Sequence, residues 1–285
     1  MFFAPDDKAD QVRNLIGYCL AYTAGKYGVR VHGCVFMSNH HHTDVSDPQG
    51  NMVGFTQQFH SLLARGINAL RGRFDTVWAC GKPCQTRRPS DDETLDDLVY
   101  TLTNPVSAEL VKRGELWPGF TTQGWRFGET REFRRPAFLF DPDGDMPAVV
   151  KLTLERPPIL DELSDDELFE LLMARVRGRE KDKQSELRTA GRRFMGLEKL
   201  RRQRWSRAPS SHAERFQREP RVATTCRWLL QQELQRDRHW ERRYADARAS
   251  LLAGLEVVFP AGTYWLRRYA GVRVEALPVQ GRAPP

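Results

Sequence analysis

The sequence predicts an α+β fold over residues 1–130 and a mostly helical, basic region after them. Apolar side chains recur at helical spacing over 11–26 and again over 55–71, which predicts two amphipathic helices. Between them, residues 29–37 and 40–45 alternate apolar and polar side chains and are rich in strand-forming residues. Ser38-Asn39 supplies a turn between these two runs. The order helix, hairpin, helix is typical of an α+β domain.

Later elements follow from capping and turn signals. The stretch 74–85 fits either a short strand or an irregular connection. Ser90 followed by an acidic turn predicts the start of a helix over 91–99, because a serine oxygen and negative charge both suit a helix N-terminus. Tyr100 lies in this helix or at its end. Ser164 predicts a capped helix that runs to about Arg175.

We expect three parts along the chain. Residues 1–130 form the α+β domain, residues 131–160 a linker that begins around a Pro- and Asp-rich turn, and residues 161–285 a helical, basic C-terminal region. Within that region, 221–255 predicts one or two long helices. The stretch 180–207 is dense in Arg and Lys and fits two interpretations: a segment that lies along nucleic acid, or an exposed helix covered with charges.

Composition limits the class of protein. The chain has 285 residues, 40% of them hydrophobic, and a formal net charge of +7. Arginine far outnumbers lysine, and its planar guanidinium pairs well with phosphate oxygens. The five cysteines are scattered and odd in number, which argues against a disulfide framework. No apolar run is long enough for a membrane helix, and no signal-peptide pattern opens the chain, so we expect a cytoplasmic protein without a membrane partner.

Three of the seven histidines stand together in VFMSNHHHTDV, residues 35–45. Residues i and i+2 of a strand point to the same face, so His40 and His42 project together and His41 points away. Two adjacent imidazoles are half of a divalent metal site. The alternative is a polar turn that is rich in histidine.

The second motif is YTLTNPVSAELV, residues 100–111. If Tyr100 and Asn104 belong to one helix, their spacing of four places them on one face. In the other interpretation, Asn104 caps a new helix that has Pro105 at its first position and runs to about Arg113.

Together, the two motifs resemble the single-tyrosine transposases of the HUH superfamily, in particular the insertion-sequence-200 type and the REP-associated branch. Those families carry a Met-Pro-Asn-His-x-His element on a strand, and the REP-associated branch also carries Tyr-x-x-x-Asn-Pro-Val. The resemblance covers about residues 10–120. It implies a ferredoxin-like antiparallel sheet with helices. The family has a further strand ahead of its first helix, for which the opening MFFAPDD is too short. We expect either that this domain lacks the strand or that the true start of the protein lies upstream.

The resemblance also implies roles for single residues. Tyr100 is the nucleophile, and His40, His42 and Asn104 hold a divalent metal ion, Mg²⁺ or Mn²⁺. Trp78 resembles a tryptophan in the segment before the tyrosine helix. Asp44 is expected to face the same way as the two ligand histidines.

The activity implied is metal-assisted cleavage and rejoining of single-stranded DNA through a phosphotyrosine intermediate, as in DNA transposition by a mobile element. The expected partners are hairpin-containing single-stranded DNA and a second copy of the chain. Basic side chains would follow the DNA backbone. The candidates are Arg65, Arg71, Arg73, Arg87 and Arg88.

Two other functions remain open from the sequence. The chain is either a non-catalytic or domesticated derivative of this family that binds DNA, or a structural metal-binding protein whose histidines only stabilise the fold. An active endonuclease forms a covalent DNA adduct, and the non-catalytic derivative does not. The structural metal-binding protein differs from both because it has no affinity for single-stranded DNA.

Overall fold

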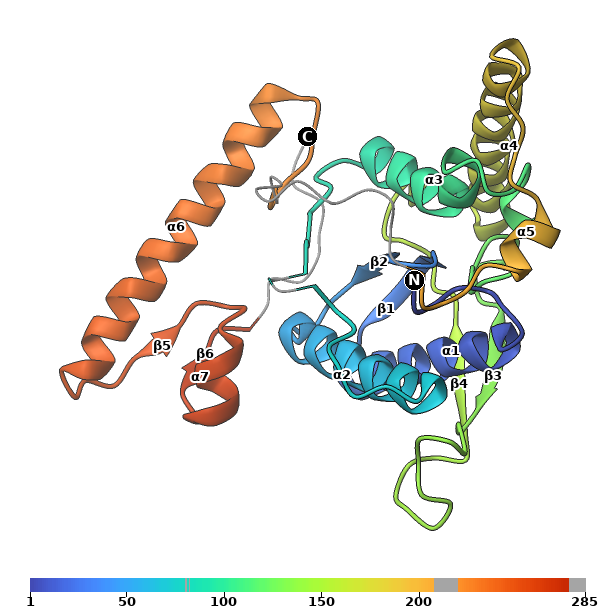
Figure 1. Cartoon of the computed structure of the whole chain (residues 1–285). Coiled ribbons are helices and arrows are strands. Elements are labelled where there is room, and N and C mark those ends of the chain that lie inside the picture. The colour runs from blue at the N-terminus through green and yellow to red at the C-terminus, as the bar shows by residue number, and fades with distance from the viewer. Residues whose placement is uncertain (80, 82, 208–219, 277–285) are drawn as a thin grey trace.

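The computed structural model describes residues 1–79, 81, 83–207 and 220–276. Its first half contains a β-hairpin between helices. Helix α1 (Ala9–Tyr27) leads into strands β1 (Arg30–Phe36) and β2 (His41–Ser46), which pair antiparallel. Helices α2 (Met52–Arg71) and α3 (Asp91–Ser107) follow. Figure 1 shows the hairpin between α1 and α2 on one side and α3 on the other. The predicted helix–hairpin–helix order is confirmed.

The core of this half explains the arrangement. Six of the seven residues of β1 are buried, because helices cover both of its faces. Leu15, Phe36 and Phe59 meet on the α1–α2 side, and Leu95 and Leu98 of α3 belong to the same cluster. The edge of β1 opposite β2 is bridged by Thr121 and by Leu154.

Strands β3 (Thr130–Arg134) and β4 (Val149–Thr153) form a second antiparallel hairpin, packed against α1. They occupy the stretch expected to be a linker. Leu152, Leu154 and Ile159 lie in the same buried cluster as α1 and α3, so the core continues across the expected boundaries at 130 and 160. The Pro- and Asp-rich sequence belongs to the loop between the strands, which is why it resembled a domain break.

Helix α4 (Asp165–Thr189) begins with a reciprocal capping box between Ser164 and Glu167. Its first half packs against α3 and contributes Leu168 and Leu172 to the main core. The short helices η1 (Gly114–Leu116) and α5 (Leu197–Arg201) flank a smaller cluster around Trp117 and the fully buried Leu200.

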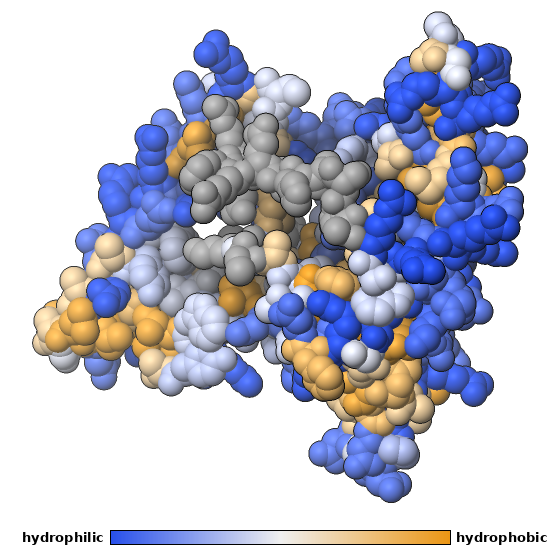
Figure 2. Space-filling model, viewed as in Figure 1, coloured by the Kyte–Doolittle hydropathy of each residue, from blue (hydrophilic) through white to orange (hydrophobic). Residues whose placement is uncertain are grey.

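The C-terminal part contains the long helix α6 (Arg227–Leu252), β5 (Val258–Phe259), α7 (Tyr264–Tyr269) and β6 (Arg273–Val274), with β5 and β6 parallel. Ala247 is the only buried residue of α6. Figure 2 shows hydrophobic surface around the end of α6 and β5, and the exposed apolar residues of this stretch are Leu251, Leu252, Leu255 and Val258. Much of this part therefore lies outside the main core.

The α+β class is confirmed, together with the helices and the hairpin. Among the described residues every sheet has two strands, so the larger ferredoxin-like sheet stays a prediction. Residues 74–79 contain neither helix nor strand, in agreement with the irregular interpretation. The separate helix starting at Pro105 is wrong: α3 continues through Asn104 and Pro105 to Ser107.

Candidate functional site

The hairpin register determines where the three histidines point. The backbone N–H of Met37 donates to the carbonyl of His40 at 2.9 Å, which closes the tight turn. Across the hairpin, Phe36 lies opposite His41 and Val35 opposite His42. Because successive side chains of a strand alternate, His41 faces the core and His42 faces α3.

His40 and His42 lie together, as the alternation predicted. Their ring centroids are 5.2 Å apart, at nearly perpendicular planes. The His42 ring lies 5.2 Å from the ring of Tyr100 on α3. The imidazole of His40 is near enough to the side chain of Asn104 to interact with it, and its Nδ1 lies 2.9 Å from Oδ1 of Asn39. The structure therefore brings the four residues of the two motifs into one group.

Helix α3 presents Tyr100 and Asn104 to the hairpin on one face, one turn apart. The helix starts where the sequence predicts, because the hydroxyl of Ser90 accepts from the backbone N–H of Glu93 and acidic residues fill the first turn. Asn104 is buried, whereas Tyr100 is 39% exposed. An exposed phenol beside buried polar groups can reach a ligand that arrives from solvent.

Burial keeps both histidines of the group neutral. It lowers the pKa of His40, with the hydrogen bond to Asn104 acting in the opposite direction. It lowers the pKa of His42 to about 4, assisted by the repulsion between the two imidazoles. At neutral pH both rings are therefore uncharged, the form that binds a metal ion.

A divalent metal ion fits this donor set. The described residues contain no group of three or more His, Cys, Asp or Glu side chains that could hold a metal. The donors that this group could offer a metal ion are the imidazoles of His40 and His42 and the side-chain amide of Asn104. Nitrogen and neutral oxygen donors suit Mn²⁺ and leave coordination positions open.

Asp44 lies on the same face of β2 as His42, between the hairpin and α3. Its buried carboxylate oxygen Oδ2 has no hydrogen-bond partner among the described residues. Burial and the nearby Asp97 raise its pKa well above the usual range, against a hydrogen bond from Thr101 and the charge of Arg88. It packs opposite Gly33, where a Cβ would come within 2.9 Å of Oδ2. Asp44 faces α3 as expected, and the partner we find there is Thr101.

Arg179 is the residue of this site that sequence reasoning missed. Its guanidinium carbon lies 5.4 Å from the centre of the Tyr100 ring. Arg175, one turn earlier on α4, pairs with Asp92 and Asp96 and so aligns α4 beside α3. No ion pair involves Arg179 among the described residues. The available signal was its spacing from Arg175, but only the packing of α4 against α3 shows which arginine reaches the tyrosine.

His41 and Trp78 belong to the core. The His41 ring stacks on Phe36 with centroids 4.6 Å apart, and its Nε2 lies 3.0 Å from Nε2 of His60. The indole N–H of Trp78 donates to the carbonyl of His60 at 2.9 Å. Burial lowers the pKa of His41 to about 3 and that of His60 to about 4.

The five arginines expected to contact DNA have different surroundings. Arg71 is not accessible to DNA, because its side chain is buried in an ion pair with Asp6 at 2.6 Å. The other four residues divide as follows. Arg73 lies over the ring of Phe2, Arg87 pairs with Glu233 and Asp237, Arg88 pairs with Asp97, and Arg65 is exposed and forms no ion pair with any described residue.

Comparison with known proteins adds no assignment: no family model matches the chain, and no curated protein or solved structure matches it. Within the part of the chain that the structure describes, no helix has the length and apolar character needed to cross a membrane. The site therefore has to be interpreted from its own geometry.

Proposed function

We propose that this protein is a metal-dependent nuclease and strand transferase for single-stranded DNA, of the HUH single-tyrosine type. One observation carries the proposal: two motifs some sixty residues apart converge, so that His40, His42 and Asn104 lie together with Tyr100 beside them. A tyrosine placed at the edge of two neutral imidazoles and an amide is the arrangement that phosphotyrosine chemistry needs.

The chain's own residues account for the first step. The phenol oxygen of Tyr100 attacks the scissile phosphorus as the bond from phosphorus to the 3′ oxygen breaks. The phenol proton passes to solvent, and the departing oxygen takes up a proton as a 3′-hydroxyl. The products are a 5′-phosphotyrosine on Tyr100 and a free 3′ end. Attack by another 3′-hydroxyl reverses the exchange and rejoins DNA without ATP.

Charge stabilisation comes from the surroundings of the tyrosine. Arg179 places a positive charge beside the ring, near the oxygens on which negative charge builds. His40, His42 and Asn104 would hold a divalent ion, which would supply Lewis-acid chemistry at the phosphate. Asn39, whose Oδ1 lies 2.9 Å from Nδ1 of His40, orients that imidazole.

The finer fold and the assembly belong to the same proposal. The hairpin β1–β2 corresponds to the centre of a ferredoxin-like HUH sheet, with the segments around Thr121 and Leu154 extending it along the free edge of β1. One nucleophilic tyrosine per chain serves one strand. We therefore propose that a homodimer acts on the two ends of a mobile DNA segment.

The test is covalent trapping. Purified protein is mixed with 5′-labelled and 3′-labelled single-stranded DNA from the flanks of its gene, with Mn²⁺, Mg²⁺ or EDTA, and run on a denaturing gel. Tyr100→Phe and His42→Ala are compared with Tyr22→Phe, a tyrosine of α1 outside the site. We expect a metal-dependent band that keeps the DNA 3′ of the cut, present in Tyr22→Phe and absent from the other two.

Other outcomes point to the alternatives. DNA binding without any adduct, at all metal concentrations, contradicts the catalytic proposal and favours a non-catalytic DNA-binding derivative. Metal binding without DNA binding favours a structural metal protein. An adduct that persists in Tyr100→Phe assigns the nucleophile to another residue.

A further inference from the structure

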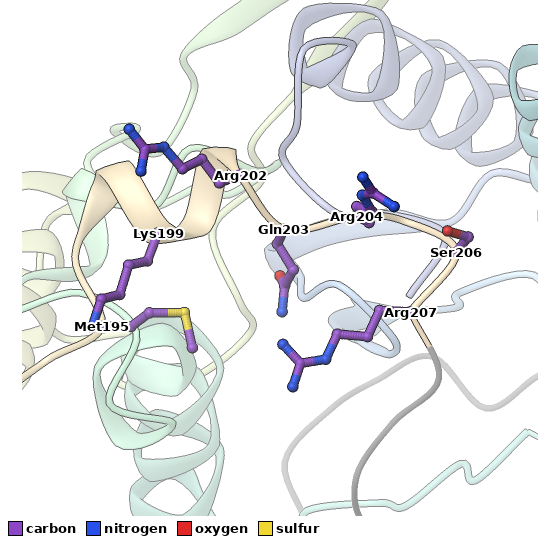
Figure 3. A pocket seen from close by; sticks show the side chains of 7 residues that line it. All are labelled: Met195, Lys199, Arg202, Gln203, Arg204, Ser206 and Arg207. Atoms are coloured by element: carbon purple, nitrogen blue, oxygen red, sulfur yellow. The ribbon is translucent and has the colours of Figure 1, made fainter.

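A basic cavity lies on the segment that follows α4. It has a volume of about 490 Å³ and is open to solvent. Four cations line it, together with two neutral polar side chains and one methionine; the full set is Met195, Lys199, Arg202, Gln203, Arg204, Ser206 and Arg207. No carboxylate is among them. In Figure 3, Lys199, Gln203 and Arg207 extend to one side of the ribbon, and Arg202 extends to the other.

Most of the positive charge in this cavity is not neutralised within the described residues. Arg202 pairs with Glu198 at 2.8 Å. Lys199, Arg204 and Arg207 are exposed and form no ion pair with any described carboxylate. This is unlike Arg71, Arg87 and Arg88, whose charges have acidic partners. An adjoining pocket shares Arg202, Gln203, Arg204 and Ser206 and also contains Asp6 and Asp7, of which Asp6 is paired with Arg71. The unpaired cations around the concave surface still attract an anion.

The same segment is attached to both elements of the candidate site. The hydroxyl of Ser38, in the turn before His40, is hydrogen-bonded to the Gln203 side chain at 3.1 Å. At the end of α3, the backbone N–H of Met195 donates to the carbonyl of Glu109 at 2.8 Å. Leu200 anchors the segment because it is completely buried in the smaller core cluster. The cavity is therefore built against the histidine turn and the tyrosine helix.

We infer that this cavity binds backbone phosphates of the single-stranded DNA that enters the candidate site. The inference rests on the proposed function for the identity of the strand. Arginine and lysine side chains that form no ion pair can contact phosphodiesters irrespective of base. The hydrogen bond from Ser38 to Gln203 places these side chains next to the turn that carries His40. Lys199 and Arg207 are the main contacts, because they extend to the same side.

The experiment compares two double variants that remove the same charges. Lys199→Ala/Arg207→Ala alters the cavity. Lys181→Ala/Arg188→Ala removes an exposed lysine and an exposed arginine from α4, away from the cavity lining. Affinity for a fluorescent single-stranded 20-mer is measured by anisotropy in EDTA over a range of salt, so that the result does not depend on cleavage. Thermal unfolding checks that both variants fold.

We expect the cavity variant to bind about tenfold more weakly and the slope of log affinity against log salt to fall by about 1.4, corresponding to two lost contacts on a single strand. The α4 variant is expected to stay within about twofold of the unaltered protein. Equal losses in the two variants, or no loss in either, overturn the inference. So does complete displacement of the 20-mer by millimolar inorganic phosphate, which assigns the cavity to a free anion.

The outcome separates this inference from the proposed function. If the unaltered protein forms the Tyr100 adduct and the cavity variant binds normally, the cavity inference fails alone. If the cavity variant loses affinity but no adduct ever forms, the cavity binds DNA and the catalytic proposal fails. If the unaltered protein binds no single-stranded DNA, both are overturned.

Discussion

The two faces of β2 carry the same residue type in opposite surroundings. On one face, His41 is enclosed by Phe36, Phe59, His60 and Trp78, and its ring stacks on aromatic neighbours. On the other face, His42 meets His40 and the exposed Tyr100. One residue of offset along a strand therefore changes a histidine from a core side chain into a candidate ligand.

The comparison shows that a run of histidines need not act as one unit. Burial lowers the pKa on both faces, so a lowered pKa does not by itself distinguish a site residue from a core residue. The difference lies in the neighbours: aromatic rings and one other imidazole around His41, and a phenol, an amide and an arginine around the pair on the α3 face.

The largest expected effect concerns the core face of β2, the face that carries His41. His41→Ala removes a ring packed against four aromatic side chains and leaves a cavity, so we expect a loss of about 3 kcal/mol in the free energy of unfolding. Denaturant unfolding measures it. Mn²⁺ affinity of the folded protein is expected to stay within about twofold, since His41 points away from the ligands. A loss of metal affinity comparable to that of His42→Ala contradicts the two-face interpretation.

The next largest effect concerns the site face of β2, the face that carries His42. His42→Ala removes one of three proposed donors, and we expect Mn²⁺ to bind about 100-fold more weakly, or about 2.7 kcal/mol. Calorimetric titration measures this. Stability without metal should change by less than about 1 kcal/mol, the reverse of the His41 pattern. Unchanged Mn²⁺ affinity would remove His42 from the ligand set.

The core face also predicts how stability depends on pH. The pKa of His60 is lowered by burial to about 4, below its usual value of about 6.5 in an unfolded chain. The contribution of neutral His60 to the free energy of unfolding is complete above pH 6.5. It is lost as the pH falls toward 4, because over that range the unfolded chain binds one proton more than the folded chain. His60→Gln should reduce the slope of unfolding free energy over pH 6 to 4.5 by about 1.4 kcal/mol per pH unit. Urea unfolding at several pH values measures the slope, and an unchanged slope contradicts the assignment.

The smallest expected effect tests whether Arg179 belongs to the site on the His42 face of β2. Arg179→Ala removes the cation beside Tyr100, and we expect adduct formation to slow about fivefold, or about 1 kcal/mol. Arg177→Ala is the matched control, since Arg177 lies on the same helix and pairs with Glu170 instead. Single-turnover trapping with saturating DNA measures the rate, and Arg179→Lys should recover part of it. Equal rates for the two alanine variants would remove Arg179 from the site.

The sequence by itself determined the local features of this protein. The strand alternation put His40 and His42 on one face, and the Ser90 cap with its acidic turn started α3 in the right place. These features depend on backbone periodicity and on hydrogen bonds between residues close in the chain. For the same reason, the helices of the first half and the hairpin could be predicted without any tertiary information.

Only the tertiary structure decided the contacts between distant segments. It showed that α3 continues through Asn104 and Pro105, because packing on the hairpin outweighs the local preference for a helix start there. It paired Arg71 with Asp6 and brought Arg179 to Tyr100. Whether an arginine is buried, paired or free depends on which acidic and aromatic groups the fold brings near it, and residues far apart in the chain supply those groups.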